Sequence, residues 1–428
     1  MAGGNDTDGG SCGDGSTDGG SRSRRGVLRA GASVVVTGAV TGSAGCLATL
    51  PPLGQRVRFG RVDAPARDDA AYTEWVPDGD AIDGETVFVR NEPRVMYVTP
   101  GDLGETELGA VPSFPTTFVK SRVDYFGHGF ESYDEVVQIH STVALVGDVD
   151  RELAGTTATE SGYESVGPYE GYDAYSRSDP ERAVLVGDDV IVWADGSTAL
   201  TDVEALVDAR DGRIPRLDGS NGDFAKVTGA AGGSPWTWVF PNRRNPEAEL
   251  GATWTAANFE FDASAAYYTQ TYLFPAGETP SRGAVQDWLE KRDRPVDSEA
   301  VDVGIDGRVV EVEMRMAAEK YRRKVDSDPA EWPQITWSVA RDGETVTVTH
   351  EAGDTASTDW LGGTYYPSRT ELTDAFGSAG DTLEPGDSVT VDFENAPEDQ
   401  RNLSIWVSPP DDESKSTMLS VPVDPEDA

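Results

Sequence analysis

Short β-branched runs bounded by Gly, Pro or Asp recur along the chain from residue 80 and are typical of strands. Helical periodicity is confined to brief pieces. Asp148 or Asp150 can cap one helix, and Thr201-Asp202-Val203-Glu204 is a capping box before another. We therefore predict an α+β unit over 80–217, with strands in TVFVR (86–90), RVMYVT (94–99), VVQIH (136–140), TVALVG (142–147) and the hairpin AVLVG-DD-VIVWA (183–194).

A Gly-rich break over 218–233 leads into a second α+β unit, which we place at 218–330. One face of a helix over 281–293 carries Val285, Trp288 and Leu289. Strand–strand–helix–strand–strand recurs in both units, so an old duplication is a hypothesis that no repeat of residues supports. The predicted strands are WTWVF (236–240), ATWTAANFEF (252–261), YYTQTYLF (267–274) and a hairpin around Asp306-Gly307.

From Trp332 onward the apolar period is strand-like, and turns recur at about 8–12 residues, which is typical of a β-sandwich. The fold class we predict is therefore α+β: two mixed sheet and helix units followed by a C-terminal immunoglobulin-like β-sandwich over 331–424. Within it TVTVTHEAGDT (345–355), LEPGDSVTV (383–391) and SIWVSPPDDESKSTML (404–419) resemble the β-sandwich of archaeal type IV pilin-like proteins. No apolar assembly helix precedes this region, so the resemblance implies a borrowed module and not filament formation.

The N-terminal pattern is that of an export signal. Arg24 and Arg25 precede an uncharged run from Ala30 to Ala44, and small residues lead to Cys46. This run is too short and too rich in Gly, Thr and Ser for a spanning helix, which needs about 20 apolar residues. It predicts a signal peptide over 1–45. A Pro- and Gly-containing tether over 46–79 then precedes the body.

The same segment resembles the twin-arginine lipoprotein signals of haloarchaea. Ser23-Arg24-Arg25-Gly26-Val27-Leu28-Arg29 is similar to the twin-arginine motif, and Ser43-Ala44-Gly45-Cys46 to a lipobox. The resemblance implies cleavage before Cys46, a lipid on that cysteine and a place on the extracellular face of the cell membrane. A short uncleaved anchor helix or a buried helix is the alternative.

The charge of the chain is consistent with a protein on the outside of a haloarchaeal cell, where the salt concentration is high. The net charge is −41, from 76 acidic and 35 basic residues, and acids are spread along the chain among 37 aromatic residues. At molar salt the Debye length is about 3 Å, which makes such self-repulsion tolerable. We expect a halophilic protein with a solvated acidic surface. Nucleic acid is not an expected partner, and neither is an anionic lipid surface, because no basic patch is evident in the sequence.

Candidate chemistry is sparse. Cys12 would be removed with the signal and Cys46 lipidated, which leaves no thiol for a disulfide or a metal centre, and we expect no cofactor and no metal. His128, His140 and His350 lie in separate units and are expected to be structural. Asp78–Glu85 (DGDAIDGE) lacks EF-hand spacing. Asn402 begins the one glycosylation sequon after the signal, a weak candidate.

These observations predict a non-enzymatic, lipid-anchored cell-surface protein with a structural or binding role. Its expected partner beyond the membrane is a surface protein or a solute. The alternative is the solute-binding lipoprotein of a transporter, which needs two doubly wound lobes. A carboxylate-dependent hydrolase is a third hypothesis. It lacks a nucleophile elbow, a P-loop and a zinc-binding H-E-x-x-H motif.

Overall fold

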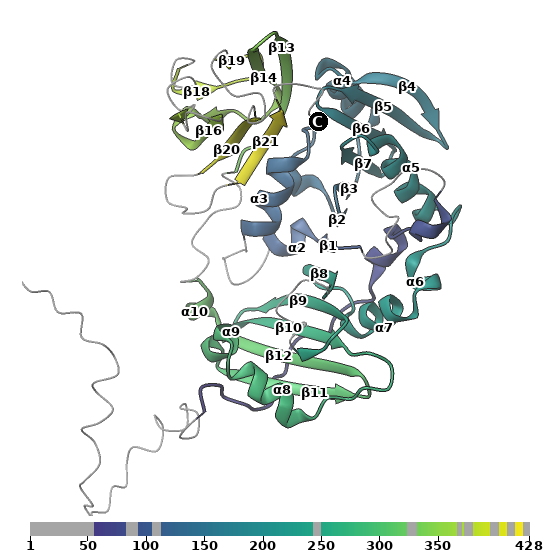
Figure 1. Ribbon diagram of the computed structural model, residues 1–428, viewed down its shortest axis with the longest axis vertical. Helices are drawn as coiled ribbons and strands as arrows, with labels where there is room; N and C mark the ends of the chain where they lie inside the picture. The colour runs from purple at the N-terminus through teal and green to yellow at the C-terminus, as the bar shows by residue number, and fades with distance from the viewer. Residues whose placement is uncertain are drawn as a thin grey trace, which may run out of the picture. The chain divides into compact units, whose positions relative to one another are not determined.

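The computed structural model describes residues 55–82, 93–104, 113–242, 250–322, 332–365, 370–371, 380–393, 402–408 and 416–422 (Figure 1). The chain divides into residues 1–50 and 51–428, and every described residue belongs to the second unit. Arg24, Arg25, Cys46 and the predicted strand 86–90 therefore lie outside the described residues.

One twelve-stranded antiparallel sheet dominates the structure, in the order β11-β12-β10-β9-β8-β1-β2-β3-β7-β6-β5-β4. Its strands are β1 (Val95–Val98), β2 (Glu135–Ile139), β3 (Thr142–Val146), β4 (Glu164–Tyr169), β5 (Tyr172–Ser178), β6 (Glu181–Val186), β7 (Val190–Asp195), β8 (Trp236–Pro241), β9 (Trp254–Asp262), β10 (Ala265–Leu273), β11 (Ala300–Asp306) and β12 (Val309–Ala317).

The prediction of two separate α+β units is wrong, because both contribute strands to this one sheet. β1 and β8 pair along their length, from Val95 opposite Val239 to Val98 opposite Trp236. The predicted break over 218–233 holds two helices, α6 (Leu217–Ser220) and α7 (Gly222–Ala231). The Asn221 side chain caps α7 by accepting hydrogen bonds from the backbone N–H groups of Asp223 and Phe224.

The strand order is symmetric about the β1–β8 pair. On one side lie β1-β2-β3-β7-β6, and on the other β8-β9-β10-β12-β11. Each half is a three-stranded meander, then a helix, α4 (Arg151–Glu160) or α8 (Arg282–Leu289), then a hairpin whose last strand pairs with the third strand of the meander. The first half adds the hairpin β4–β5. This repeated topology supports the duplication hypothesis.

Helices cover both faces of the sheet. On one face α4 and α8 each pack over an apolar cluster. Between these helices a row of aromatic rings crosses the strands: the ring centroids of Trp236 and Phe259 are 4.1 Å apart, and those of Phe259 and Tyr268 are 4.6 Å apart. The same face carries α2 (Pro100–Gly104), α3 (Ser113–Arg122) and the 3-10 helix η4 (Phe130–Ser132). The opposite face carries α5 (Ala199–Arg210), α6 and α7.

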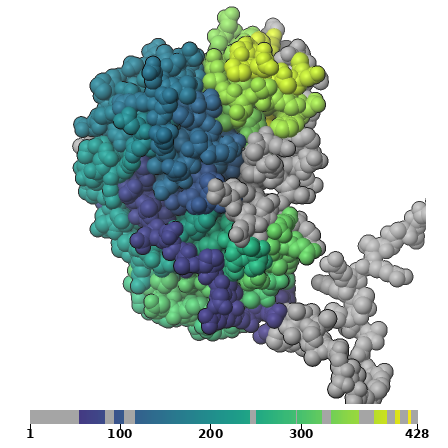
Figure 2. Space-filling model, turned by 180° about the vertical axis from the view of Figure 1, so that it is seen from behind, coloured from purple at the N-terminus to yellow at the C-terminus, as the bar shows by residue number. Residues whose placement is uncertain are grey.

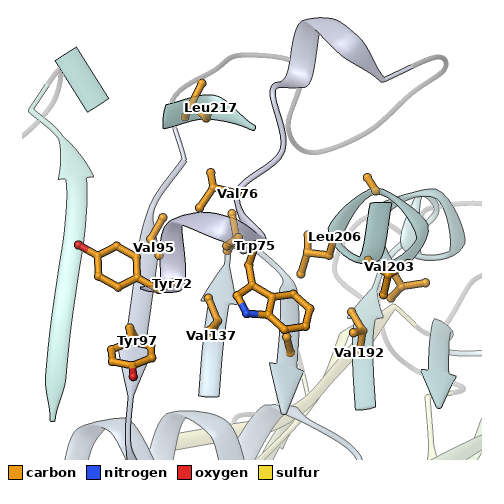
Figure 3. Close-up of a cluster of buried hydrophobic side chains, with 14 of the residues drawn as sticks. Tyr72, Trp75, Val76, Val95, Tyr97, Val137, Val192, Val203, Leu206 and Leu217 are labelled. Atoms are coloured by element: carbon orange, nitrogen blue, oxygen red, sulfur yellow. The ribbon is translucent and has the colours of Figure 1, made fainter. Parts of the chain in front are cut away.

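The tether predicted over 46–79 is wrong for residues 55–79, which pack onto the sheet. Tyr72 and Trp75, in the 3-10 helix η2 (Ala71–Trp75), are almost fully buried. Figure 3 shows the Tyr72 ring beside Val95 and Tyr97 of β1, and the Trp75 ring between Val137 of β2 and Leu206 of α5. The burial of two large aromatic side chains outweighs the loop-like appearance that Pro, Gly and Asp give this stretch.

One local prediction also differs from the structure. α5 begins at Ala199, so Thr201 lies inside the helix, and Thr198 precedes it with its hydroxyl donating to Asp202. Between β4 and β5, Glu170 and Gly171 both have positive φ, as the tight turn of this hairpin requires. The hairpins β6–β7 and β11–β12 and the helix α8 confirm the sequence predictions.

The C-terminal region consists of small antiparallel sheets around one apolar core. Trp337 and Val346 on one sheet and Ile405 and Leu419 on another meet in that core. The strands are β13 (Ile335–Asp342), β14 (Thr345–Gly353), β15 (Ala356–Ser357), β16 (Leu361–Tyr365), β17 (Thr370–Glu371), β18 (Thr382–Leu383), β19 (Ser388–Asp392), β20 (Asn402–Val407) and β21 (Ser416–Pro422), with the 3-10 helix η7 (Thr358–Trp360).

Short helices complete the described structure. η3 (Gly79–Ala81) follows η2, and α9 (Asp293–Asp297) and α10 (Ala318–Arg322) lie close together, with the Lys320 ammonium donating to the Asp297 carbonyl. Among the described residues, no helix is long and apolar enough to cross a membrane.

Candidate functional site

A cleft of about 1010 Å³ opens where the large sheet meets the C-terminal sheets. Five segments line it: α3, the β5–β6 turn, the loop after β7, β13 and β21. Its lining combines charged groups with hydroxyls and a few apolar side chains such as Phe118 and Met418. Convergence of polar groups from several segments on one concavity is typical of a ligand site.

Two ion pairs lie along the cleft. The Arg122 guanidinium at the end of α3 donates to both carboxylate oxygens of Asp195, at 3.1 Å and 3.2 Å. Arg341 of β13 pairs with Asp179 in the β5–β6 turn. Both pairs are partly exposed to solvent, so the cleft presents alternating positive and negative groups to anything that enters it.

A third pair, fully buried, adjoins the cleft through Arg182, which lines it. Asp124, only 1% exposed, pairs with Arg182 at the start of β6. The Tyr163 hydroxyl donates to the other Asp124 oxygen at 2.6 Å, and the Trp193 indole N–H donates to that hydroxyl at 3.1 Å. Burial, reinforced by the adjacent Asp124 charge, holds the pKa of Tyr163 well above its usual range, so the tyrosine stays a donor.

Backbone groups next to Asp124 fasten the C-terminal sheets to the large one. The Gln334 amide donates to the carbonyls of Val123 and Asp124, at 3.3 Å and 3.2 Å. The Tyr125 N–H donates to the Thr336 hydroxyl at 2.7 Å. From β5, Arg177 donates to the Trp337 carbonyl at 2.9 Å. The walls of the cleft are thus joined by several short-range polar contacts.

The histidines predicted to be structural lie apart from one another and from the cleft. His128 Nε2 accepts a hydrogen bond from the Asp150 N–H at the start of α4. His140 occupies the β2–β3 turn at positive φ, and burial lowers its pKa. His350 is buried in β14 beside Trp337, and burial lowers its pKa too. The His350 carbonyl accepts a hydrogen bond from the Gly386 N–H in the turn before β19.

The other candidates from the sequence also lie elsewhere. Asn402 is the first residue of β20, opposite Pro422. Asp78 caps η3, and the last three residues of the DGDAIDGE stretch lie outside the described residues. Within the described part of the chain, no group of three or more His, Cys, Asp or Glu side chains is arranged to hold a metal ion.

Sequence reasoning missed the charged residues that form the cleft. They come from four segments that are distant in the sequence, so no spacing identifies them. The signal that exists is a charge beside an apolar run, as at Asp124 in RVDYFG and Arg182 in ERAVLV. In a chain with 76 acidic residues this signal is weak, because most such charges are solvated.

A second buried charge lies on the face of the sheet that also carries α5, α6 and α7, below residues 62–69. Glu260 of β9 is 3% exposed, 3.9 Å from Arg67 Nε, and Arg67 also pairs with Glu311 of β12. Burial raises the pKa of Glu260 to about 7; Arg67 opposes this shift, and Glu313 and Glu311 add to it. Glu260 therefore takes up a proton near neutral pH.

No protein-family model and no curated protein matches the chain. Among solved structures it is similar to TP0453 in crystal form I, at 12% identity over 58% of this chain and 95% of that chain, with a TM-score of 0.35. Crystal form III gives 11% identity, 58% and 96% coverage and a TM-score of 0.34. Crystal form IV gives 13% identity over 61% of this chain and 98% of that chain, with a TM-score of 0.33. Similarities at these TM-scores carry no argument about fold or function.

Replacing Asp124 with Ala should destabilise the protein by about 3–5 kcal/mol, because it leaves Arg182 buried without its partner. Asp195→Ala is the matched control: it removes a partly exposed pair and should cost about 1 kcal/mol or less. The double variant Asp124→Leu with Arg182→Leu should recover part of the loss. Denaturant unfolding in molar salt measures all three. Equal costs for Asp124→Ala and Asp195→Ala would contradict the role given to the buried pair.

Replacing Glu260 with Gln should stabilise the protein at pH 8 and have little effect at pH 4.5. The folded pKa of about 7 exceeds the ordinary 4.5, so the folded state holds a proton that the unfolded state has lost. The free energy of unfolding therefore falls as the pH rises from about 4.5 to about 7, and this contribution is constant at higher pH. The gain should be on the order of 2–3 kcal/mol at pH 8.

Thermal melts of the Glu260→Gln variant across this pH range, in molar salt, test the effect. Exposed Glu278→Gln serves as the control and should follow the unsubstituted protein at every pH. A Glu260→Gln curve parallel to that of the unsubstituted protein between pH 4.5 and 8 would show that Glu260 is not the titrating group.

Proposed function

We propose that the chain is a non-enzymatic, lipid-anchored surface protein of halophilic archaea that binds a solute or a surface protein in the cleft between its large sheet and its C-terminal sheets. Arg24 and Arg25 direct twin-arginine export, and Cys46 carries the lipid on the extracellular face of the membrane. The observation that carries the binding role is the cleft itself, which charged groups from four segments line and which Arg182 connects to a buried polar network.

The chemistry of the cleft favours recognition over catalysis. Asp179 and Asp195 both accept hydrogen bonds from arginines, and a general base must instead be placed to take a proton from a substrate. Paired charges with hydroxyls between them suit a polar ligand that carries both donors and acceptors. The carboxylate-dependent hydrolase is for this reason the weakest of the three hypotheses.

The transporter alternative is also disfavoured. A solute-binding lipoprotein of that kind needs two doubly wound lobes with parallel strands, whereas all strand pairs described for the large sheet are antiparallel. We assign the C-terminal region as an immunoglobulin-like β-sandwich similar to that of pilin-like proteins. Its two principal sheets around one core support this assignment.

The anchor is tested by Cys46→Ser, which should move the protein from washed membranes into the medium while export continues. Replacing Arg24 and Arg25 with Lys should instead retain it in the cytoplasm, because the twin-arginine route requires the arginine pair. Cell fractionation with immunoblotting measures both. Retention of the Cys46→Ser variant in washed membranes would point to an uncleaved helix and refute the lipid anchor.

The binding role is tested with a photo-reactive amino acid placed at Ser197, on the rim of the cleft, in intact cells at molar salt. We expect a covalent adduct there and a several-fold weaker one when Arg122→Gln is added. Ser264, exposed on the large sheet away from the cleft, is the control position. The same adducts from Ser264, or none from Ser197, would contradict binding in the cleft.

A further inference from the structure

The first described residues are fastened to the β11 edge of the large sheet. The backbone N–H groups of Arg56 and Val57 donate to the Glu290 carboxylate, at 2.7 Å and 3.2 Å. Val57 is fully buried against α8, and Phe59 forms a parallel bridge with Val301 of β11. Figure 2 shows this segment, in purple, running along the surface of the molecule. The chain therefore enters the fold at a fixed point.

The distance from Cys46 to that point is limited by chain length. Nine residues lie between Cys46 and Arg56, and the ten steps of extended chain that join them cover at most about 36 Å. Twelve strands spaced by about 4.8 Å make a sheet about 50 Å across. A lipid on Cys46 would thus keep the β11 edge near the membrane, while the β4 edge can lie well away from it.

The segment 55–61 at this edge carries three arginines and no acidic residue, whereas α8 and β11 beside it also carry Asp287, Asp302 and Asp306. Arg56 and Arg58 flank the buried Val57, so their side chains project away from the core. Arg61 is 84% exposed, and Lys291 is exposed just after α8. The pairs of Arg56 with Asp293 and of Arg61 with Asp63 are both largely exposed, and such pairs contribute little, so these arginines can exchange partners.

We propose, against the expectation from the sequence that an anionic lipid surface is not a partner, that this edge, made of residues 55–61 with α8 and β11, faces the lipid bilayer and that the arginines of 55–61 contact the phosphates of lipid headgroups. The proposal rests on the lipid anchor at Cys46. A lipid chain and a basic segment are two signals that reinforce each other in membrane attachment. At molar salt the attraction between arginines and headgroup phosphates acts only over about 3 Å. The short connection from Cys46 would hold the segment 55–61 close enough to the membrane for such contacts. The cleft, built on β5, β6 and β7 far along the strand order, then faces away from the membrane.

Single-cysteine labels test this orientation in the lipidated protein. Besides the lipidated Cys46, the chain after the signal has no cysteine, so Asp287→Cys on α8 and Glu164→Cys on β4 each give one site for a fluorophore. Both replace an exposed carboxylate and are therefore matched. In membrane vesicles containing lipids with a nitroxide on the headgroup, we expect quenching at residue 287 to be at least three-fold stronger than at residue 164.

The outcomes separate the orientation from the anchor. Equal quenching at the two sites, or stronger quenching at 164, with the protein still in the membrane fraction, would overturn the orientation and leave the anchor standing. Loss of the protein from washed vesicles would overturn the proposed anchor and this inference with it.

The headgroup contacts have their own test. The double variant Arg58→Gln with Arg61→Gln should lower quenching at residue 287 about two-fold, because the edge is then held by the lipid alone. Arg151→Gln with Arg213→Gln removes the same charge from the other half of the sheet and should change nothing. Identical quenching in both double variants would overturn the contact between the arginines and the phosphates.

Discussion

One buried carboxylate joins the parts of this molecule that form the cleft. The side chain of Asp124 holds Arg182 of β6 and Tyr163 ahead of β4, and its carbonyl accepts from Gln334 at the start of the C-terminal sheets. Burying an ion pair gains little net free energy, because desolvation offsets the attraction, but leaving one partner unpaired is costly. The pair therefore constrains the geometry. An arrangement that separates these elements would leave Asp124 or Arg182 buried without its partner, which is unfavourable.

The large sheet provides the frame on which that constraint acts. Both of its outer edges are protected against pairing with other chains. Residues 58–60 cover the β11 edge through backbone hydrogen bonds to Val301, and β4 carries a bulge between Ser165 and Gly167, followed by Pro168. The repeated topology on either side of β1–β8 leaves one extra hairpin, β4–β5, in the first half. Arg177 on that hairpin reaches the C-terminal sheets, so the element that breaks the symmetry also helps to build the cleft.

The sequence predicts local structure well where one pattern dominates. The hairpin of β6 and β7 and the helix α8 follow from apolar alternation and from Val285, Trp288 and Leu289 on one face. It does not predict that β1 and β8 pair, because local periodicity carries no information about partners about 140 residues apart. Residues 55–79 resemble a tether because Pro, Gly and charge dominate them, and the burial of Tyr72 and Trp75 depends on tertiary packing. The cleft was not predictable, since its arginines and aspartates share no spacing.

The most direct test of this account is the distance across the cleft. Spin labels at Ser197→Cys and Ser420→Cys, in a chain whose Cys12 and Cys46 are replaced by Ser, report the separation of the two walls by pulsed electron paramagnetic resonance. We expect a single narrow distance distribution for this chain and a broad one once Asp124→Ala is added. A broad distribution before that substitution, or an unchanged narrow one after it, would contradict the claim that the buried carboxylate fixes the cleft.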